Sequence, residues 1–293
     1  MSHDHEHDHG HDHDHDHHHR PGRMRRVLRR LRKLVADRGL FGALKAVLHY
    51  GRWRLRLLLS GGSALTGDAK RAVAAAQKVV SSHDPHPHYA EAYRSSERRY
   101  WEHIPAWIIE DFGGGAGACL DIGCAYGTLM VLCKQVTGCE AYGTDFVPYY
   151  MSESLVAEQG LHYEISNIEL DPIPWDRKFD IIVMTEVLEH LNFQARPTLQ
   201  KLASALAPGG RFYLSCPDAA EWGPNHRYYS RYEDLPMPSD HSGSVIDDHV
   251  WHFSEDELRA VVASAGLDIE RFAYARGDGS RHFNLTLKAR QPA

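Results

Sequence analysis

Short apolar runs alternate with stretches of helical periodicity from about residue 118 to the end of the chain. The strand-like runs lie at 118–123, 141–145, 162–166, 179–184, 210–216, 269–275 and 284–290, and the helical stretches at 127–137, 148–159, 194–206 and 254–265. This alternation predicts an α/β fold, in which helices cover both faces of an open parallel sheet. Only a loop separates the last two runs, so we expect them to form an antiparallel hairpin.

The chain before this region has a different pattern. Residues 1–20 hold ten histidines and six acidic residues, a composition that cannot bury a core. Residues 20–56 carry thirteen Lys or Arg against one acid, Asp37, and include an amphipathic helical face. Residues 57–112 are typical of a linker and helical cap. The expected divisions are a disordered tail, a basic helical extension with linker, and a main domain, at 1–20, 21–89 and 90–293.

Charge and cysteine content narrow the choice of partners and compartment. A net charge of −6 predicts no general attraction to nucleic acid. The basic segment 20–56 has no run of about 18 uncharged residues, as a bilayer span would need. Its cationic face could lie on an anionic membrane surface, dock an acidic partner, contact nucleic-acid phosphates or pack on its own domain. The acidic start is unlike a signal peptide and the five cysteines include no C-x-x-C pair, which favours a cytoplasmic protein.

A glycine-containing turn, "LDIGCAYG" at 120–127, follows the first strand of the main domain and leads into a helix. Such a turn presents backbone N–H groups to a ligand, and glycine lets the ligand come close. Asp121 lies in this strand, and Asp145 ends the next strand 24 positions later. An acid at about that spacing accepts hydrogen bonds from ribose hydroxyls. The sequence therefore predicts recognition of an adenosine-containing ligand.

The turn disfavours two other nucleotide classes. The dinucleotide fingerprint G-x-G-x-x-G would need glycine where the chain has Ala125 and Thr128, so a nicotinamide dehydrogenase is only a further alternative. A triphosphate-binding loop would need a Gly-Lys-Ser/Thr end, which this turn lacks. Asp121 would repel a pyrophosphate, whereas it suits a ligand that carries an ammonium and a sulfonium.

Several segments together resemble one enzyme family. "LDIGCAYG" looks like the first motif of the class I S-adenosylmethionine-dependent methyltransferases. "YGTDFVP", "FDIIVMTEVLEHL", "LAPGGRFYLSCP" and "HFSEDELRAVVASAGLDIE" resemble later segments of that family in the same order. The resemblance covers roughly residues 90 to 290. It implies a Rossmann-like seven-stranded sheet, S-adenosylmethionine as the cofactor, and methyl transfer.

The resemblance also implies where the cofactor binds. Asp145 is similar to the family's ribose-binding acid, and Phe146 is placed to lie against adenine. Asn167 stands where the family has an aspartate that accepts a hydrogen bond from the adenine amino group. The amide oxygen of Asn167 can still accept that hydrogen bond. The implied cofactor-binding residues are Asp121, Gly123, Cys124, Ala125, Gly127, Asp145, Phe146, Asn167, Ile168, Thr185 and Glu186.

The segment "EVLEH" offers chemistry for the acceptor. Glu186, Glu189 and His190 share one face if the segment is a helical turn. The cluster resembles the metal site of ubiquinone-biosynthesis O-methyltransferases, and with His249 of "DDHVWHF" that of small-RNA 2′-O-methyltransferases. The implied ligands of Mg²⁺ or another divalent ion are Glu186, Glu189, His190 and His249. Metal-free members carry a similar segment, in which case His190 or His249 would be the catalytic base.

The segment 217–251 is a long insert rich in aromatic residues, of the kind that forms lids or substrate walls. Its side chains Trp222, His226, Tyr228, Tyr229, Tyr232 and Trp251 could stack on an acceptor or cover the core. We expect O-methylation of a sugar, a glycosylated natural product or another polar small molecule. The alternatives are methylation of an RNA end and, in another class, a non-catalytic protein that binds metal or a partner through its histidine-rich tail.

Overall fold

The computed structural model describes residues 65, 67–84, 88–240, 245–276 and 281–290. The histidine-rich tail and the basic helix expected before residue 57 lie outside the described residues. The chain divides into two compact units, Met1–Gly62 and Ser63–Ala293, and all the described residues belong to the second. None of the helices in its described part is long and apolar enough to cross a membrane.

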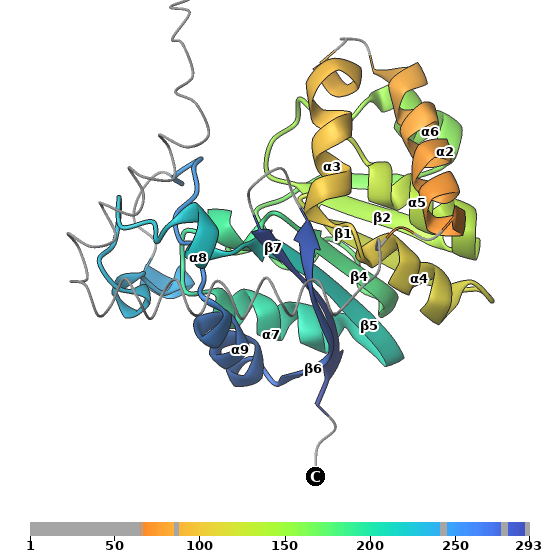
Figure 1. Cartoon of the computed structure of the whole chain (residues 1–293). Coiled ribbons are helices and arrows are strands. Elements are labelled where there is room, and N and C mark those ends of the chain that lie inside the picture. Colours follow the sequence, from red (N-terminus) through yellow and green to blue (C-terminus); the bar gives the residue numbers. More distant parts are fainter. Residues whose placement is uncertain (1–64, 66, 85–87, 241–244, 277–280, 291–293) are drawn as a thin grey trace, which may run out of the picture. The chain divides into compact units, whose positions relative to one another are not determined.

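A seven-stranded sheet forms the centre of this unit (Figure 1). Its strand order is β3-β2-β1-β4-β5-β7-β6. Strands β1 to β5 are parallel, and β7 runs antiparallel to both β5 and β6. The sheet confirms the Rossmann-like α/β fold with an antiparallel hairpin at its end. The strands are β1 (Ala118–Ile122), β2 (Glu140–Asp145), β3 (His162–Ile165), β4 (Phe179–Thr185), β5 (Leu206–Pro217), β6 (Leu267–Arg276) and β7 (Arg281–Ala289).

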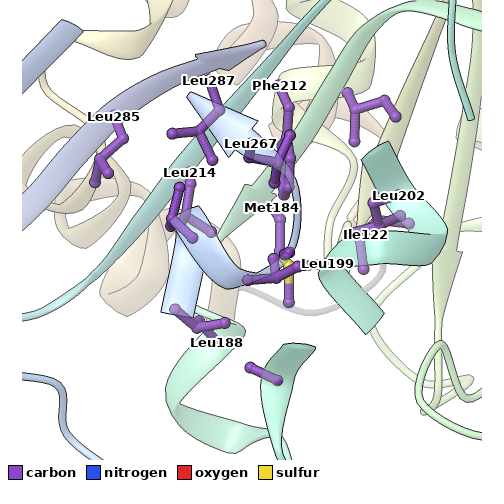
Figure 2. Close-up of a cluster of buried hydrophobic side chains, with 14 of the residues drawn as sticks. Ile122, Met184, Leu188, Leu199, Leu202, Phe212, Leu214, Leu267, Leu285 and Leu287 are labelled. Atoms are coloured by element: carbon purple, nitrogen blue, oxygen red, sulfur yellow. The ribbon is translucent and has the colours of Figure 1, made fainter. Parts of the chain in front are cut away.

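Helices pack on both faces of the sheet because successive side chains of a strand point to opposite faces. In β4, Ile182 and Met184 pack with α7 (Ala195–Ala205) and α9 (Glu255–Ser264), in the cluster of Figure 2. Their neighbours Ile181 and Val183 belong to a second cluster, on the other face. That second cluster includes residues of α2 (Gly67–His83), α4 (Ile104–Phe112), α5 (Thr128–Thr137) and α6 (Glu153–Gln159).

The expected cap before β1 consists of helical segments: α2, a π-helical turn η1 (Tyr89–Tyr93), α3 (Arg94–Tyr100) and α4. A buried carboxylate, Glu97, ties this cap to α5. It accepts hydrogen bonds from Tyr89 Oη (2.9 Å) and from Thr128 Oγ1 (2.6 Å), at the start of α5. The cap is therefore fixed to the helix that follows the glycine turn.

The predicted helix at 148–159 is wrong in its first five residues, since α6 begins at Glu153. Ser152 is extended and caps the helix by accepting a hydrogen bond from Leu155 N. The chain between Asp145 and Ser152 is a loop that carries the exposed Phe146, Tyr149 and Tyr150.

Candidate active site

The glycine turn packs closely against the loop that follows β4. Gly123 and Gly127 have φ of +66° and +78°, in the left-handed region that favours glycine. A Cβ on Gly123 would lie 2.3 Å from Val187 Cγ2, in the loop after β4. The Cys124 side chain is buried against Gly143, so this residue offers a ligand only its backbone. The turn therefore requires a bare backbone at Gly123.

Ala125 takes the left-handed conformation too, with φ of +44°. Its N–H donates to Asp145 Oδ2 (3.0 Å), and Val147 N donates to Asp145 Oδ1 (3.2 Å). Burial raises the pKa of Asp145 although these backbone N–H groups lower it. Burial, followed by the charge of Asp145, raises the pKa of Asp121 well above its ordinary range. Two buried carboxyl groups beside the turn favour a cationic ligand over an anionic one.

A pocket lies at the carboxyl ends of β1 and β2. Its lining brings together five of the expected cofactor-binding residues: Gly123, Asp145, Phe146, Asn167 and Ile168. His190, Asn192 and the segment 245–247 line the same pocket. Asn167 Oδ1 accepts a hydrogen bond from Glu169 N (2.9 Å), which fixes the loop after β3. Five of the eleven expected cofactor-binding residues thus share one cavity with Val187 and His190 of the "EVLEH" segment.

Glu169 and Asn192, which no sequence pattern singled out, hold the wall of this pocket. The Glu169 carboxylate accepts hydrogen bonds from Asn192 N and Phe193 N, both at 2.9 Å. The Asn192 amide in turn bonds the backbone of Ile246, donating to its O (3.1 Å) and accepting from its N (2.6 Å). The Asn192 side chain therefore holds segment 245–247 at the pocket.

Glu169 predicts a pH dependence of stability. Burial raises its pKa from 4.5 to about 7, against the backbone N–H groups of Asn192 and Phe193 and the charge of Lys201. Because the folded protein holds this proton more tightly than the unfolded chain, its contribution to stability is complete below the unfolded pKa and is lost as the pH rises through about 7. The expected loss is at most roughly 3 kcal/mol.

Urea unfolding across this pH range measures the effect. We expect wild type to lose more stability with rising pH than Glu169→Gln. The control Glu164→Gln, at an exposed position on β3, should follow wild type. Equal slopes for wild type and Glu169→Gln would contradict the prediction.

Glu186 leaves the helical face that the sequence suggested. Its φ is +55°, and the 3₁₀ turn η2 begins only at Leu188 (Leu188–His190). Its Oε1 accepts a hydrogen bond from Ser215 Oγ (2.8 Å), and its Oε2 lies 2.8 Å from Nδ1 of the buried His282. Thr185, before it, pairs with Ser215 across β4 and β5. Glu186 is therefore engaged with β5 and β7.

The other three expected metal ligands do come together. A carboxylate oxygen of Glu189 and one ring nitrogen each of His190 and His249 lie within 4.8 Å of one another. Glu189 is 1% exposed, and neither of its carboxylate oxygens has a hydrogen-bond partner among the described residues. Burial, with the charge of Glu186, raises the pKa of Glu189 well above its ordinary range. A buried carboxylate without a partner is rare in proteins and points to a ligand.

Backbone hydrogen bonds bring His249 to this cluster across 59 positions of sequence. Val250 N and Trp251 N both donate to Glu189 O (2.7 and 3.1 Å), and His190 Nδ1 donates to Asp248 O (3.1 Å). Burial lowers the pKa of His190, and it lowers that of His249 to about 4. Both imidazoles are therefore neutral near pH 7 and each retains a lone pair.

Four of the six aromatic side chains expected to contact an acceptor or cover the core fall into two groups. Trp222, in α8 (Ala219–Trp222), is 42% exposed, and its ring centroid lies 5.7 Å from that of His249 and 5.6 Å from that of His282. In contrast, Trp251 is buried, and Tyr229 and Tyr232 pack against the core. Of these side chains, Trp222 offers an exposed aromatic surface beside the cluster.

Comparison with protein families agrees with this geometry. A methyltransferase-domain family matches residues 71–271, which is more than half of the chain. The chain therefore belongs to this methyltransferase-domain family, as its resemblance to the class I S-adenosylmethionine-dependent methyltransferases implied.

Individual relatives are more distant. The ribosomal protein L11 methyltransferase of Burkholderia lata is 30% identical over 139 residues, which cover 47% of this chain and 44% of that protein. The chain thus spans less than half the length of the curated relatives it matches. The 1,6-didemethyltoxoflavin-N1-methyltransferase of Burkholderia thailandensis, solved with 1,6-didemethyltoxoflavin and S-adenosylhomocysteine, is 17% identical, with a TM-score of 0.50 over 79% of this chain and 94% of that one. At this identity the likeness shows a shared fold.

Proposed function

We propose that this methyltransferase acts on a hydroxyl group of a polar acceptor, such as a sugar or a glycosylated natural product. The observation that carries the proposal is the cluster of Glu189, His190 and His249, since His190 also lines the pocket that holds Asp145 and Phe146. A hydroxyl must lose its proton during methylation, and an amine or thiolate acceptor has less need of such a cluster.

The pocket residues suit S-adenosylmethionine. When bound, this cofactor supplies a methyl group on a positively charged sulfur. A cationic ligand bound beside Asp121 and Asp145 would lower the raised pKa of both carboxyl groups and so stabilise their charged forms, and Asp145 would hold the ribose hydroxyls. Phe146 and Ile168 offer apolar surface to the adenine ring. These side chains hold the methyl donor in one orientation, which converts a bimolecular encounter into an aligned one.

Without a bound metal ion, one of the two histidines would accept the proton of the acceptor. His190 and His249 are neutral at pH 7, so a ring nitrogen of either can take a proton from a hydroxyl group. Trp222 would hold a sugar or ring of the acceptor against its exposed indole, next to His249. The acceptor would then lie between the aromatic surface and the cluster.

The cluster also fits a divalent ion, because the Glu189 oxygens, which have no hydrogen-bond partner in the described part of the chain, and two neutral imidazoles form a mixed oxygen and nitrogen donor set. A bound ion would lower the pKa of the acceptor hydroxyl and orient it. Mg²⁺ prefers oxygen ligands, whereas imidazole suits first-row transition ions. We therefore favour a first-row divalent transition ion over Mg²⁺, held by Glu189, His190 and His249 and not by Glu186. Mn²⁺ is a suitable probe, because it also accepts carboxylate oxygen.

A titration and an acceptor screen test the proposal. S-adenosylhomocysteine should bind the full chain in calorimetry, and acceptors with sugar hydroxyls should be methylated. The screen should include RNA with a free 3′ end, proteins and amines as competing acceptor classes. Chelator should abolish O-methylation and Mn²⁺ should restore it. Activity that survives chelation would leave a histidine as the base, and methylation of nitrogen alone would overturn the proposal.

A further inference from the structure

We propose that His252 is a positioning residue, which fixes the tautomer of His249 and leaves the His249 lone pair on Nε2. The inference rests on the proposed function, because it assigns His249 a role as base or ligand. His252 itself is 9% exposed and is not a member of the Glu189–His190–His249 cluster.

A backbone carbonyl determines the proton position on His252. His252 Nδ1 lies 2.9 Å from Gly223 O, and a carbonyl oxygen can only accept a hydrogen bond. Nδ1 of His252 therefore carries a proton. Gly223 is itself held at the end of α8, where its N–H donates to Ala219 O (2.9 Å). The carbonyl that accepts this hydrogen bond is thus part of the end of α8.

The proton position on His249 follows from that on His252. In the uncharged form of His252, protonation of Nδ1 leaves the lone pair on Nε2, which lies 2.8 Å from His249 Nδ1. His249 Nδ1 must then be the donor, so the lone pair of His249 is on Nε2. The hydrogen bonds run in one direction, from His249 through His252 to the carbonyl of Gly223. Histidines that bind metals or protons commonly donate their second N–H in this way.

His190 has the same arrangement with a simpler partner. Its Nδ1 donates directly to Asp248 O (3.1 Å), so its lone pair also remains on Nε2. The two imidazoles lie nearly perpendicular, at 83°, with centroids 4.6 Å apart. His190 depends on a backbone carbonyl and His249 on a side chain, so replacing the partner side chain can change the tautomer of His249 and has no counterpart for His190.

Two variants of His252 separate positioning from simple packing. His252→Leu keeps apolar bulk but removes the hydrogen-bond acceptor of His249 Nδ1. His252→Gln keeps an oxygen acceptor near the position of Nε2. Long-range ¹H–¹⁵N NMR of the full chain at neutral pH reports the tautomer, and His249→Ala identifies the His249 signals by their loss. The melting temperature and S-adenosylhomocysteine affinity of each variant show that its fold and cofactor pocket are retained.

We expect His249 to be protonated on Nδ1 in wild type and in His252→Gln, and to shift toward protonation on Nε2 in His252→Leu. The Mn²⁺ concentration for half-maximal methyl transfer should rise by about 10- to 100-fold in His252→Leu and recover in His252→Gln. An unchanged His249 tautomer in His252→Leu, or Nε2 protonation in wild type, would overturn the inference. The tautomer of His249 is measured without methyl acceptor or metal ion. Failure of the proposed function alone would therefore not change that result.

Discussion

Glu189→Gln is expected to melt at a higher temperature than wild type in the presence of chelator, while its methyl-transfer rate falls by about 100-fold or more. The folded protein buries this carboxyl group with no hydrogen-bond partner among the described residues, and burial raises its pKa. Its contribution to stability is therefore complete below the unfolded pKa and is lost as the pH rises. Glutamine removes the buried charge and also the carboxylate that the proposed metal site needs.

Thermal melts with chelator at two pH values test the stability half of this prediction. The gain in melting temperature from Glu189→Gln should be larger at the higher pH, and Mn²⁺ should raise the melting temperature of wild type more than that of the variant. Glu164→Gln, at an exposed position, is the matched control and should change neither property. A Glu189→Gln variant with the wild-type rate would show that this carboxylate takes no part in methyl transfer.

Hydrophobic periodicity predicts the sheet well because it depends on local sequence. All seven strands lie at the apolar runs of the sequence, although β5 begins at Leu206, four residues before its predicted start. The glycine turn and Asp145 are also accessible to prediction, since each follows a strand at a fixed spacing. In contrast, the end of a helix depends on single caps, and no periodicity marks Ser152 as the cap of α6.

The departure of Glu186 from the cluster could not be predicted from spacing. Positions three and four apart share a face only in a helix, and the left-handed φ of Glu186 breaks that relation. Its partner His282 reaches it because β7 pairs with β5, where His282 lies opposite Pro217. That register is set by tertiary pairing, so no local pattern marks His282 as a site residue. The same holds for Asn192 and Ile246, which are 54 positions apart.

Gly123→Ala is expected to weaken binding of S-adenosylhomocysteine by about 100-fold or more. Alanine at φ of +66° is strained by roughly 1–2 kcal/mol. In addition, its Cβ would lie 2.3 Å from Val187 Cγ2, which is too close, so the turn or the loop after β4 must move. Both segments line the pocket proposed to hold the cofactor, so we expect the displacement to reduce affinity as well as stability.

Two further variants separate strain from steric overlap. Gly138→Ala meets a similar φ of +72°, but nothing lies within 4 Å of the added Cβ. It should lose stability by roughly 1–2 kcal/mol and bind S-adenosylhomocysteine like wild type. The double variant Gly123→Ala/Val187→Ala removes the overlapping methyl group and should recover about 10-fold in affinity relative to Gly123→Ala. Calorimetric titration measures each affinity. If Gly123→Ala binds as tightly as Gly138→Ala, close packing of the turn against Val187 does not shape the cofactor pocket.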